Sequence, residues 1–183
     1  FGWFLNVYIE IFRGTPMIVQ SMVIFYGSAQ AFNISLDRTW AAIFIVSINT
    51  GAYMSEIVRG GILAVDPGQF EAATALGMTH GQTMRKVVLP QVVRNILPAT
   101  GNEFVINIKY TSVLNVISVV ELYFTGNTVA TQNYQYFPTF TIIAVIYFVL
   151  TFTITRILRY IERRLDSDTY TTGANQMQVN EVK

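Results

Sequence analysis

The stretch "EAATALGMTHGQTMRKVVLP", residues 71–90, is a polar interruption in a chain that is otherwise strongly apolar. It contains a glutamate, the only histidine, an arginine, a lysine and two glycines, and long apolar segments lie on both sides of it. The fold therefore depends on two questions: what the flanking apolar segments are, and what kind of structure the polar stretch forms between them.

The flanking segments have the composition of membrane-spanning helices. Only 13% of the 183 residues are charged, about half of the roughly 25% found in average globular chains. No charged residue occurs within residues 14–36, 39–55 or 122–155, and a helix needs about 20 mostly apolar residues to cross a membrane. Because a soluble domain of this size could hardly bury three such runs, we expect an all-α integral membrane protein.

Composition also excludes several classes of function. A net charge of +1 gives no electrostatic reason to expect nucleic-acid binding. The absence of cysteine excludes disulfides and thiolate metal sites, and His80 has no suitably spaced partner, so we expect no metal site. We also expect no catalytic site, because neither His-Glu-x-x-His nor Gly-x-Ser-x-Gly occurs.

Four membrane segments can be placed, at about residues 16–32, 40–63, 96–120 and 138–158. Basic residues favour the cytoplasmic ends of such segments. They cluster at Arg13, around the central stretch and after the last segment, whereas residues 123–137 contain none. We therefore expect the central stretch and both chain ends to be cytoplasmic. Residues 1–165 would form one transmembrane domain, and the polar residues 166–183 a disordered tail.

The central stretch contains two helix starts. Asp66 suits an N-cap, with Pro67 at the first helical position and Gln69 three residues after the cap. Thr79 and Gln82 repeat the spacing of a capping box. The pattern predicts two short helices between the second and third membrane segments.

Glycine and proline set the limits of these two helices. Gly77 lies where the C-terminus of the first helix favours glycine. We expect Pro90 to limit the second helix and Pro98 to lie near the first turn of the next membrane segment.

The first short helix presents small side chains, Ala72 and Ala73, beside Glu71 and before Gly77. Such a surface lets another backbone approach closely, which suits docking to a protein. The alternative is an amphipathic helix lying on the lipid surface, and such helices usually carry several basic residues. This stretch has no arginine or lysine between Asp66 and Met84, so docking to a protein is favoured.

The residues Glu71-Ala72-Ala73, followed by Gly77 and then by the sequence VVLP at 87–90, resemble the EAA signature of ABC importer permeases. Four further blocks resemble the polar amino-acid (histidine/glutamine-type) importer family: FRGTP at 12–16, EIVRGGI at 56–62, KYTSV at 109–113 and ERR at 162–164. Together they cover residues 7–165 in the family's order.

This resemblance implies the transmembrane domain of a type I ABC importer, with cytoplasmic coupling helices that dock to an ATPase. Family members have five core helices, so it also implies one helix before Phe1. The residues expected to couple to the ATPase are Gly68, Glu71, Ala72, Ala73, Gly77 and Arg85.

The resemblance also implies partners. The chain lacks Gly-x-x-x-x-Gly-Lys-Ser/Thr, so ATP and magnesium would be held by a separate ATPase subunit and this chain would need no cofactor. A solute-binding protein outside the bacterial cell membrane would deliver the amino acid, for example glutamine, histidine, arginine or cystine. A second permease copy or a sister permease would complete the pathway, and the sequence leaves this choice and the amino acid open.

The third segment is unusually polar, which suggests a substrate pathway. Its candidate residues are Glu103, Asn107, Lys109, Thr111 and Ser112. Lys109 is thirteen residues from Ile96, roughly 20 Å along a helix, and a charge at that depth usually marks a pathway or a paired site. The alternatives are an ion pair with Glu103 or Glu56, or a lysine beside a helix break. Tyr110 stands where family members commonly have aspartate.

Three other functions remain to be weighed. The first is an intramembrane enzyme, but this sequence lacks the catalytic motifs named above. A secondary transporter should show an inverted repeat, which we do not find. A structural membrane subunit would not need a docking helix. An ATP-driven importer permease accounts for more of the sequence than any of these.

Overall fold

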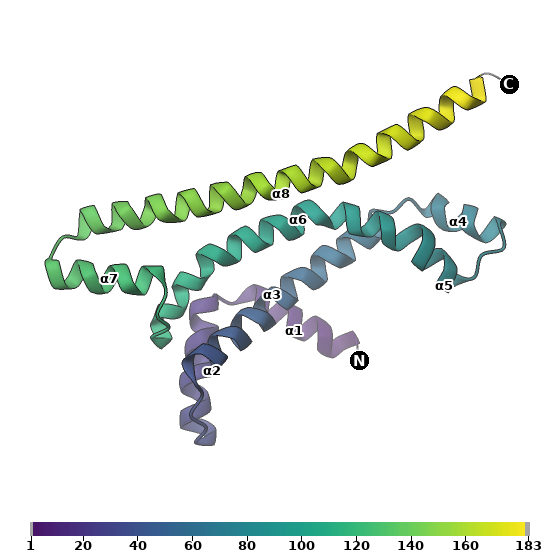
Figure 1. Ribbon diagram of the computed structural model, residues 1–183. Helices are drawn as coiled ribbons and strands as arrows, with labels where there is room; N and C mark the ends of the chain where they lie inside the picture. The colour runs from purple at the N-terminus through teal and green to yellow at the C-terminus, as the bar shows by residue number, and fades with distance from the viewer. Residues whose placement is uncertain (1, 182–183) are drawn as a thin grey trace. The chain divides into compact units, whose positions relative to one another are not determined.

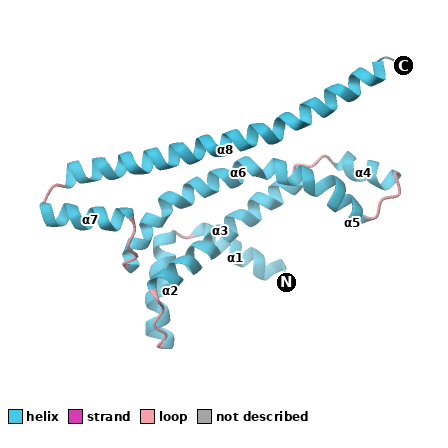
Figure 2. Cartoon of the chain, in the orientation of Figure 1, coloured by secondary structure: helices cyan, strands magenta, loops and turns pink. Residues whose placement is uncertain are grey.

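The computed structural model describes residues 2–181, with side chains described for residues 2–164, and this part of the chain is helical without any strand (Figure 2). The helices follow one another along the chain in the order shown by the colours of Figure 1. They are α1 Gly2–Gly14, α2 Met17–Phe32, α3 Arg38–Leu63, α4 Pro67–Ala75, α5 His80–Thr83, the π-helical turn η1 Met84–Val88, α6 Leu89–Tyr110, the 3₁₀ helix η2 Thr111–Ile117, α7 Leu122–Asn133 and α8 Tyr136–Glu181.

The chain divides into two compact units, which we describe separately. The first unit comprises Phe1–Glu56 and Glu103–Phe152, and the second comprises Ile57–Asn102 and Thr153–Lys183. The polar stretch quoted above lies wholly in the second unit, whereas the predicted pathway residues lie in the first. The predicted docking residues and the predicted pathway residues therefore lie in different units of the fold.

Among the described residues, two helices are long and apolar enough to cross a membrane, α3 and the part of α8 from Tyr136 to Arg164. A third span results if His80–Ile117 and Leu122–Asn133, bent by 55°, count as one. The helix α2 is apolar but has only 16 residues. The predicted first, second and fourth segments coincide with α2, α3 and α8, and the backbone of α8 continues to Glu181, through residues for which we expected disorder.

The third predicted segment is organised differently from the expectation. Pro90 does not limit the second short helix, and Pro98 lies inside α6 rather than near its first turn. The Leu89 N–H donates to Met84 O across the wider π turn that directly precedes Pro90. Because proline has no N–H to donate, the widened turn carries the helix past it. The sequence therefore continues from α5 into α6 without a loop.

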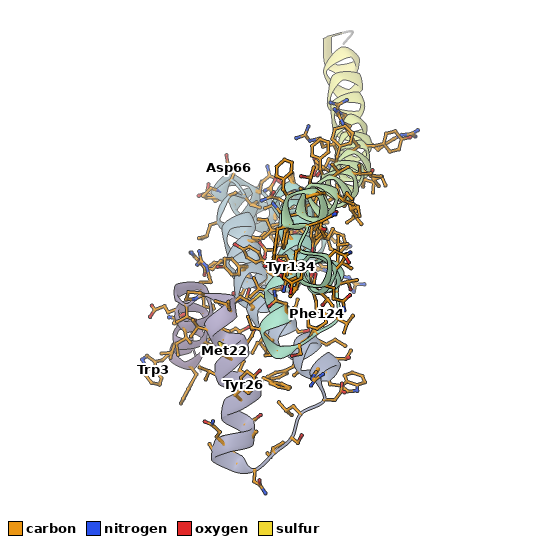
Figure 3. The ribbon with its side chains drawn as sticks, turned by 90° about the vertical axis from the view of Figure 1, so that its left-hand side faces the viewer. Trp3, Met22, Tyr26, Asp66, Phe124 and Tyr134 are labelled. Carbon is orange, nitrogen blue, oxygen red and sulfur yellow. The ribbon has the colours of Figure 1, made fainter. Side chains whose placement is uncertain are left out.

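The expected outer connection also contains a helix that the sequence reading missed. Residues 122–133 form α7, whose start is capped by the Glu121 carboxylate. That carboxylate accepts hydrogen bonds from Tyr123 N (2.8 Å) and Phe124 N (2.6 Å), and from the Tyr147 hydroxyl at 3.0 Å. The last residue of α7 is Asn133. Tyr134 follows it as the C-cap and adopts a left-handed conformation (φ 56°). Tyr134 and Phe124 are both labelled in Figure 3. The sequence interpretation placed the end of the third segment at about residue 120 and assigned no role to Glu121, the side chain that caps this helix.

The first unit has its core where α2, α3 and η2 meet. Its buried apolar residues are Met17, Ala41, Ala42, Ile45, Leu114 and Ile117. The Tyr26 hydroxyl on α2 donates to Val116 O at 3.1 Å, and the Tyr8 hydroxyl on α1 donates to Ile48 O of α3. These bonds attach α1 and α2 to partners that are distant in the sequence.

The second unit packs Val65, Val88 and Val92 against Ile62, Phe70, Met84 and Ile96. This cluster joins the end of α3 to α4, η1 and α6. Gly61 makes the closest approach: a Cβ placed there would overlap Ile96 Cγ2 and lie 3.4 Å from Val92 Cγ1. A glycine at this position lets α3 and α6 approach each other directly.

Gly61→Ala should therefore destabilise the protein, whereas Gly60→Ala should not. A methyl group at Gly61 overpacks the contact with Ile96, at a cost of about 1–3 kcal/mol, whereas the space around Gly60 is open and alanine is the better helix former there. Thermal unfolding in detergent measures the difference. Adding Ile96→Ala should recover part of the loss in Gly61→Ala, and equal melting temperatures for the two glycine variants would contradict the argument.

Candidate coupling and pathway sites

The start of α4 is fixed by a side-chain cap. The Asp66 carboxylate accepts a hydrogen bond from Gly68 N at 2.7 Å, and Pro67 occupies the first helical turn, as expected. The Gln69 side chain does not return to the cap. Its Oε1 instead accepts from Gln91 Nε2 at 3.3 Å, so this glutamine joins α4 to α6 rather than closing a capping box.

The end of α4 is fixed by its glycine. Gly77 has φ +72°, a conformation that costs other residues energy but not glycine. Its N–H donates to Thr74 O at 2.9 Å, and Met78 N–H donates to Ala73 O at 3.0 Å. This pair of bonds is the Schellman arrangement that satisfies the last carbonyls of a helix, and it confirms that Gly77 ends the first short helix.

The next turn starts with the capping box that the sequence predicted. Thr79 Oγ1 accepts from Gln82 N at 3.4 Å, and Gln82 Oε1 accepts from Thr79 N at 2.9 Å. Thr83 is buried beneath it. With caps at Asp66, Gly77 and Thr79, the segment has one defined path from α3 to α6.

The surface of α4 combines charge, small side chains and one large apolar group. Glu71, Ala72 and Gly68 are exposed, as is Arg85 in η1, whereas Ala73 is only 3% exposed and packs inside the unit. Leu76 was not among the residues expected to couple to the ATPase, yet it is 82% exposed at the end of α4. The outer surface at the end of α4 thus places an exposed leucine next to small side chains and a carboxylate.

The predicted pathway residues lie around the junction of α6 and η2, and only some of them interact. Thr50 Oγ1 on α3 donates to Asn107 Oδ1 at 3.2 Å. The hydroxyls of Thr111 and Ser112 donate to the carbonyls of Ile108 and Lys109, at 2.8 and 2.7 Å. These last two bonds occupy the hydroxyl protons locally, within the helix break.

Lys109 is exposed in the last turn of α6, directly before η2 begins. No ion pair to its ammonium group occurs within the described residues 2–164. Glu56, one of its two candidate partners, pairs instead with Arg13, at 3.3 Å. The geometry thus matches the alternative of a lysine beside a helix break, and it removes the proposed pairing with Glu56. The ion pair between Arg13 and Glu56 joins the end of α1 to α3.

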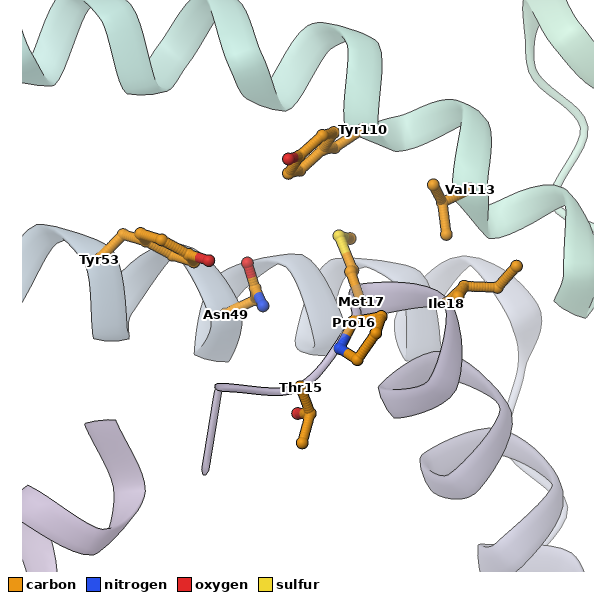
Figure 4. Close-up of a pocket in the computed structure, with 8 residues that line it drawn as sticks. All are labelled: Thr15, Pro16, Met17, Ile18, Asn49, Tyr53, Tyr110 and Val113. Carbon is orange, nitrogen blue, oxygen red and sulfur yellow. The ribbon is translucent and has the colours of Figure 1, made fainter. Parts of the chain in front are cut away.

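Two pockets open in the first unit. A cavity of about 240 Å³ lies beside the turn between α1 and α2 (Figure 4), and Tyr110 is among its lining residues. A wider one of about 480 Å³ includes Thr111 and Glu121 in a mostly apolar lining. Neither the first cavity nor Asn49, a buried residue of its lining, was found from the sequence, because the lining comes from three separate segments.

The part of the chain that the structure describes is all-helical, with helices long and apolar enough to span a membrane and a capped, exposed polar segment between two of its longer helices. Residues 1–167 match the family described as binding-protein-dependent transport system inner membrane component. The chain belongs to this family of multi-pass inner-membrane transport components.

Relatives and a solved structure agree with this assignment. The chain is 38% identical over 168 residues to the arginine transport system permease ArtQ of Bacillus subtilis, covering 92% of this chain and 77% of that protein. It is 40% identical over 169 residues to the glutamine transport system permease GlnP of Escherichia coli, covering 90% and 77%. A crystal structure of an amino acid ABC transporter with histidines superposes with a TM-score of 0.82 at 45% identity, covering 87% of this chain and 74% of that one.

Gly77→Ala should loosen the segment after α4, whereas Gly81→Ala should not. Alanine at φ +72° is strained by roughly 1 kcal/mol or more, but Gly81 lies within α5 without a positive φ and with open space around it. Hydrogen exchange of the amides of residues 72–83 should become faster in the first variant alone. Gly77→Asn should be intermediate, because asparagine tolerates the left-handed region. Unchanged exchange in Gly77→Ala would show that the turn does not hold the segment.

Proposed function

We propose that this chain is the permease subunit of an ATP-driven importer for a polar amino acid, and that α4 transmits the motion of a separate ATPase subunit to the membrane helices. The observation that carries the proposal is the geometry of α4. Both of its ends are capped, its inner face is packed through Ala73 and Phe70, and its outer face leaves Glu71, Ala72 and Leu76 exposed. A rigid helix with an exposed apolar end can transmit force to the helices it packs against.

The proposal assigns the chemistry to the partner. The family model and the importer permeases named above support a transport subunit, and the sequence contains no phosphate-binding loop of the Gly-x-x-x-x-Gly-Lys-Ser/Thr type. ATP and magnesium would bind to the ATPase subunit, so this chain would be non-catalytic and need no cofactor. A solute-binding protein would deliver the amino acid, and a second copy or a sister permease would complete the pathway.

The orientation follows from the distribution of basic residues. Arg85, Lys86 and Arg94 accompany the docking segment, and residues 123–137 have no basic residue. By the tendency of cytoplasmic loops to carry arginine and lysine, α4, α5 and the C-terminal end would face the cytoplasm, where the ATPase would be. The candidate contacts on this side are Gly68, Glu71, Ala72, Gly77 and Arg85, with Ala73 supporting them from beneath.

Glu71→Lys should weaken assembly with the ATPase without unfolding the membrane helices. The Glu71 side chain is exposed, so reversing its charge costs little within this chain, whereas mismatched charge at an interface costs on the order of tenfold or more in affinity. The measurements are co-purification of the candidate ATPase and ATP-dependent amino-acid uptake in proteoliposomes. Glu10→Lys, an equal reversal on the exposed surface of α1, is the control. Unchanged assembly and uptake in Glu71→Lys would refute coupling through this face of α4.

Lys109→Ala should reduce uptake if residues 103–112 line the pathway, because the pathway then loses a cation that can hold the substrate carboxylate. Lys109→Arg keeps the charge and should retain more activity. Initial rates of uptake by complexes of equal ATPase content provide the comparison. Full activity in Lys109→Ala would leave the lysine with a purely structural position at the helix break.

A further inference from the structure

The part of α8 at residues 156–164 carries a concentrated positive charge. Its arginines are Arg156, Arg159, Arg163 and Arg164, and all four side chains are exposed. The only acidic residue in this segment is Glu162. Four positive charges therefore accompany a single negative charge on two turns of one helix.

Glu162 lies on the face of α8 that packs against α6. A Cβ placed at Gly101 of α6 would lie 3.5 Å from Glu162 Oε1 and 3.4 Å from Leu158 Cδ1. No ion pair joins Glu162 to an arginine within residues 2–164. With 3.6 residues per helical turn, Arg156 and Arg163 lie on the side of α8 turned away from Leu158. The acidic group and the arginine-rich surface thus belong to different faces of the helix.

The length of α8 places this surface at the level of lipid headgroups. The apolar span of α8 runs from Tyr136 to Arg164, and the exposed rings of Tyr136 and Phe137 at its start suit one membrane interface. A hydrocarbon layer of about 30 Å takes up about 20 helical residues. Counted from Tyr136, the hydrocarbon layer ends near Arg156, so the remaining two turns extend through the headgroup region of the other interface.

Arginine is suited to bind the phosphate groups that occupy this region. Its guanidinium group stays charged and can donate two parallel N–H bonds to one phosphate. The Arg164 guanidinium is also held against Tyr160: its Nη2 donates to the Tyr160 hydroxyl at 2.6 Å, and its Cζ lies 5.2 Å from the ring centre. Tyr160 is 59% exposed, and tyrosine is enriched at membrane interfaces.

Two apolar side chains distinguish a lipid from the other candidate occupants, an ATPase subunit and free phosphate. Ile157 and Ile161 are exposed beside the arginines, where they can contact acyl chains. A free phosphate ion has no apolar part for these isoleucines to contact. A soluble subunit does not reach the edge of the hydrocarbon layer, where Arg156 and Ile157 lie.

We propose that the arginine face of α8, formed by Arg156, Arg159, Tyr160, Arg163 and Arg164, binds the headgroup of an anionic phospholipid. An anionic lipid is favoured over a zwitterionic one because arginine offers no acceptor for an ammonium group and each basic residue near the surface adds attraction to anionic lipid. This inference goes beyond the proposed transport function, since it requires only that α8 spans the membrane.

The test measures which lipid lies beside this face in the full chain reconstituted with the candidate ATPase. The bilayers contain phosphatidylglycerol and phosphatidylcholine, and one of the two carries brominated acyl chains that quench a neighbouring tryptophan. Ile157→Trp, combined with Trp3→Phe and Trp40→Phe, places a single reporter next to Arg156 and leaves the arginine face intact. The relative binding constant should favour phosphatidylglycerol by about fivefold or more, the factor expected for one basic residue near an anionic surface.

The native Trp40 provides a matched control at the start of α3. It is 72% exposed, and the charged residues next to it in the sequence are Asp37 and Arg38, which balance each other. In a chain with Trp3→Phe alone, Trp40 should be quenched equally by the two brominated lipids. A preference of the same size at Trp40 would show that the reporter at residue 157 detects no specific site, and would overturn the proposal.

Substitution of two exposed arginines tests the face itself. Arg159→Gln with Arg163→Gln should bring the relative binding constant at the reporter close to one, whereas Arg159→Lys with Arg163→Lys should retain most of the preference, because lysine keeps the charge. Equal quenching by the two lipids before substitution, or an unchanged preference in the double glutamine variant, would refute lipid binding by these arginines.

Two further measurements address the other occupants. If the lipid preference appears only when the ATPase is removed, the ATPase covers this face and the proposal is wrong. Inorganic phosphate, added at constant ionic strength, should leave the preference unchanged. Its loss would identify a site for free phosphate instead of a lipid.

Discussion

An apolar phase offers no water to hydrogen-bond the polar backbone, so every interruption of a membrane helix has to be satisfied by the chain itself. This constraint explains the main irregularities of the structure. Where α1 ends and α2 begins, the Gln20 amide donates to the carbonyls of Phe12 and Thr15. Where α7 begins, the Glu121 carboxylate accepts from two backbone N–H groups. Polar side chains in this protein are placed largely where the backbone needs them.

The same constraint links the interruptions to the proposed function. A turn that is satisfied by fixed side chains presents groups in a fixed direction, and a transporter needs such groups within an apolar environment. Gln20 satisfies the backbone at the α1–α2 turn and, through the same amide group, orients Asn49. In the second unit, the caps around α4 satisfy its ends and leave Glu71 and Leu76 exposed.

Gly77 and Pro90 show which features of the backbone can be predicted from the local sequence and which cannot. Gly77 ends α4 in the left-handed conformation that its position predicts, because the requirement for positive φ is local. Pro90 was expected to end a helix, yet η1 widens the turn before it and the helix continues. Packing of Val88 and Val92 against Val65 stabilises the uninterrupted helical path from α5 through η1 into α6. A local rule predicts the strain at a residue, whereas the surrounding contacts decide how the strain is relieved.

The sequence by itself determined the helical class, the apolar segments, the capping box at Thr79 and Gln82, and the family, because composition, periodicity and collinear motifs are properties of neighbouring residues. The helix α7 was missed because its start depends on capping by Glu121. In the sequence, this glutamate looks the same as any other charged residue at the end of an apolar run. Only the tertiary structure decided that Glu56 pairs with Arg13, that Ala73 is buried while Leu76 is exposed, and that Asn49, Tyr53 and Tyr110 share one cavity. These facts join residues tens of positions apart, and their cause is packing between helices, which no local pattern records.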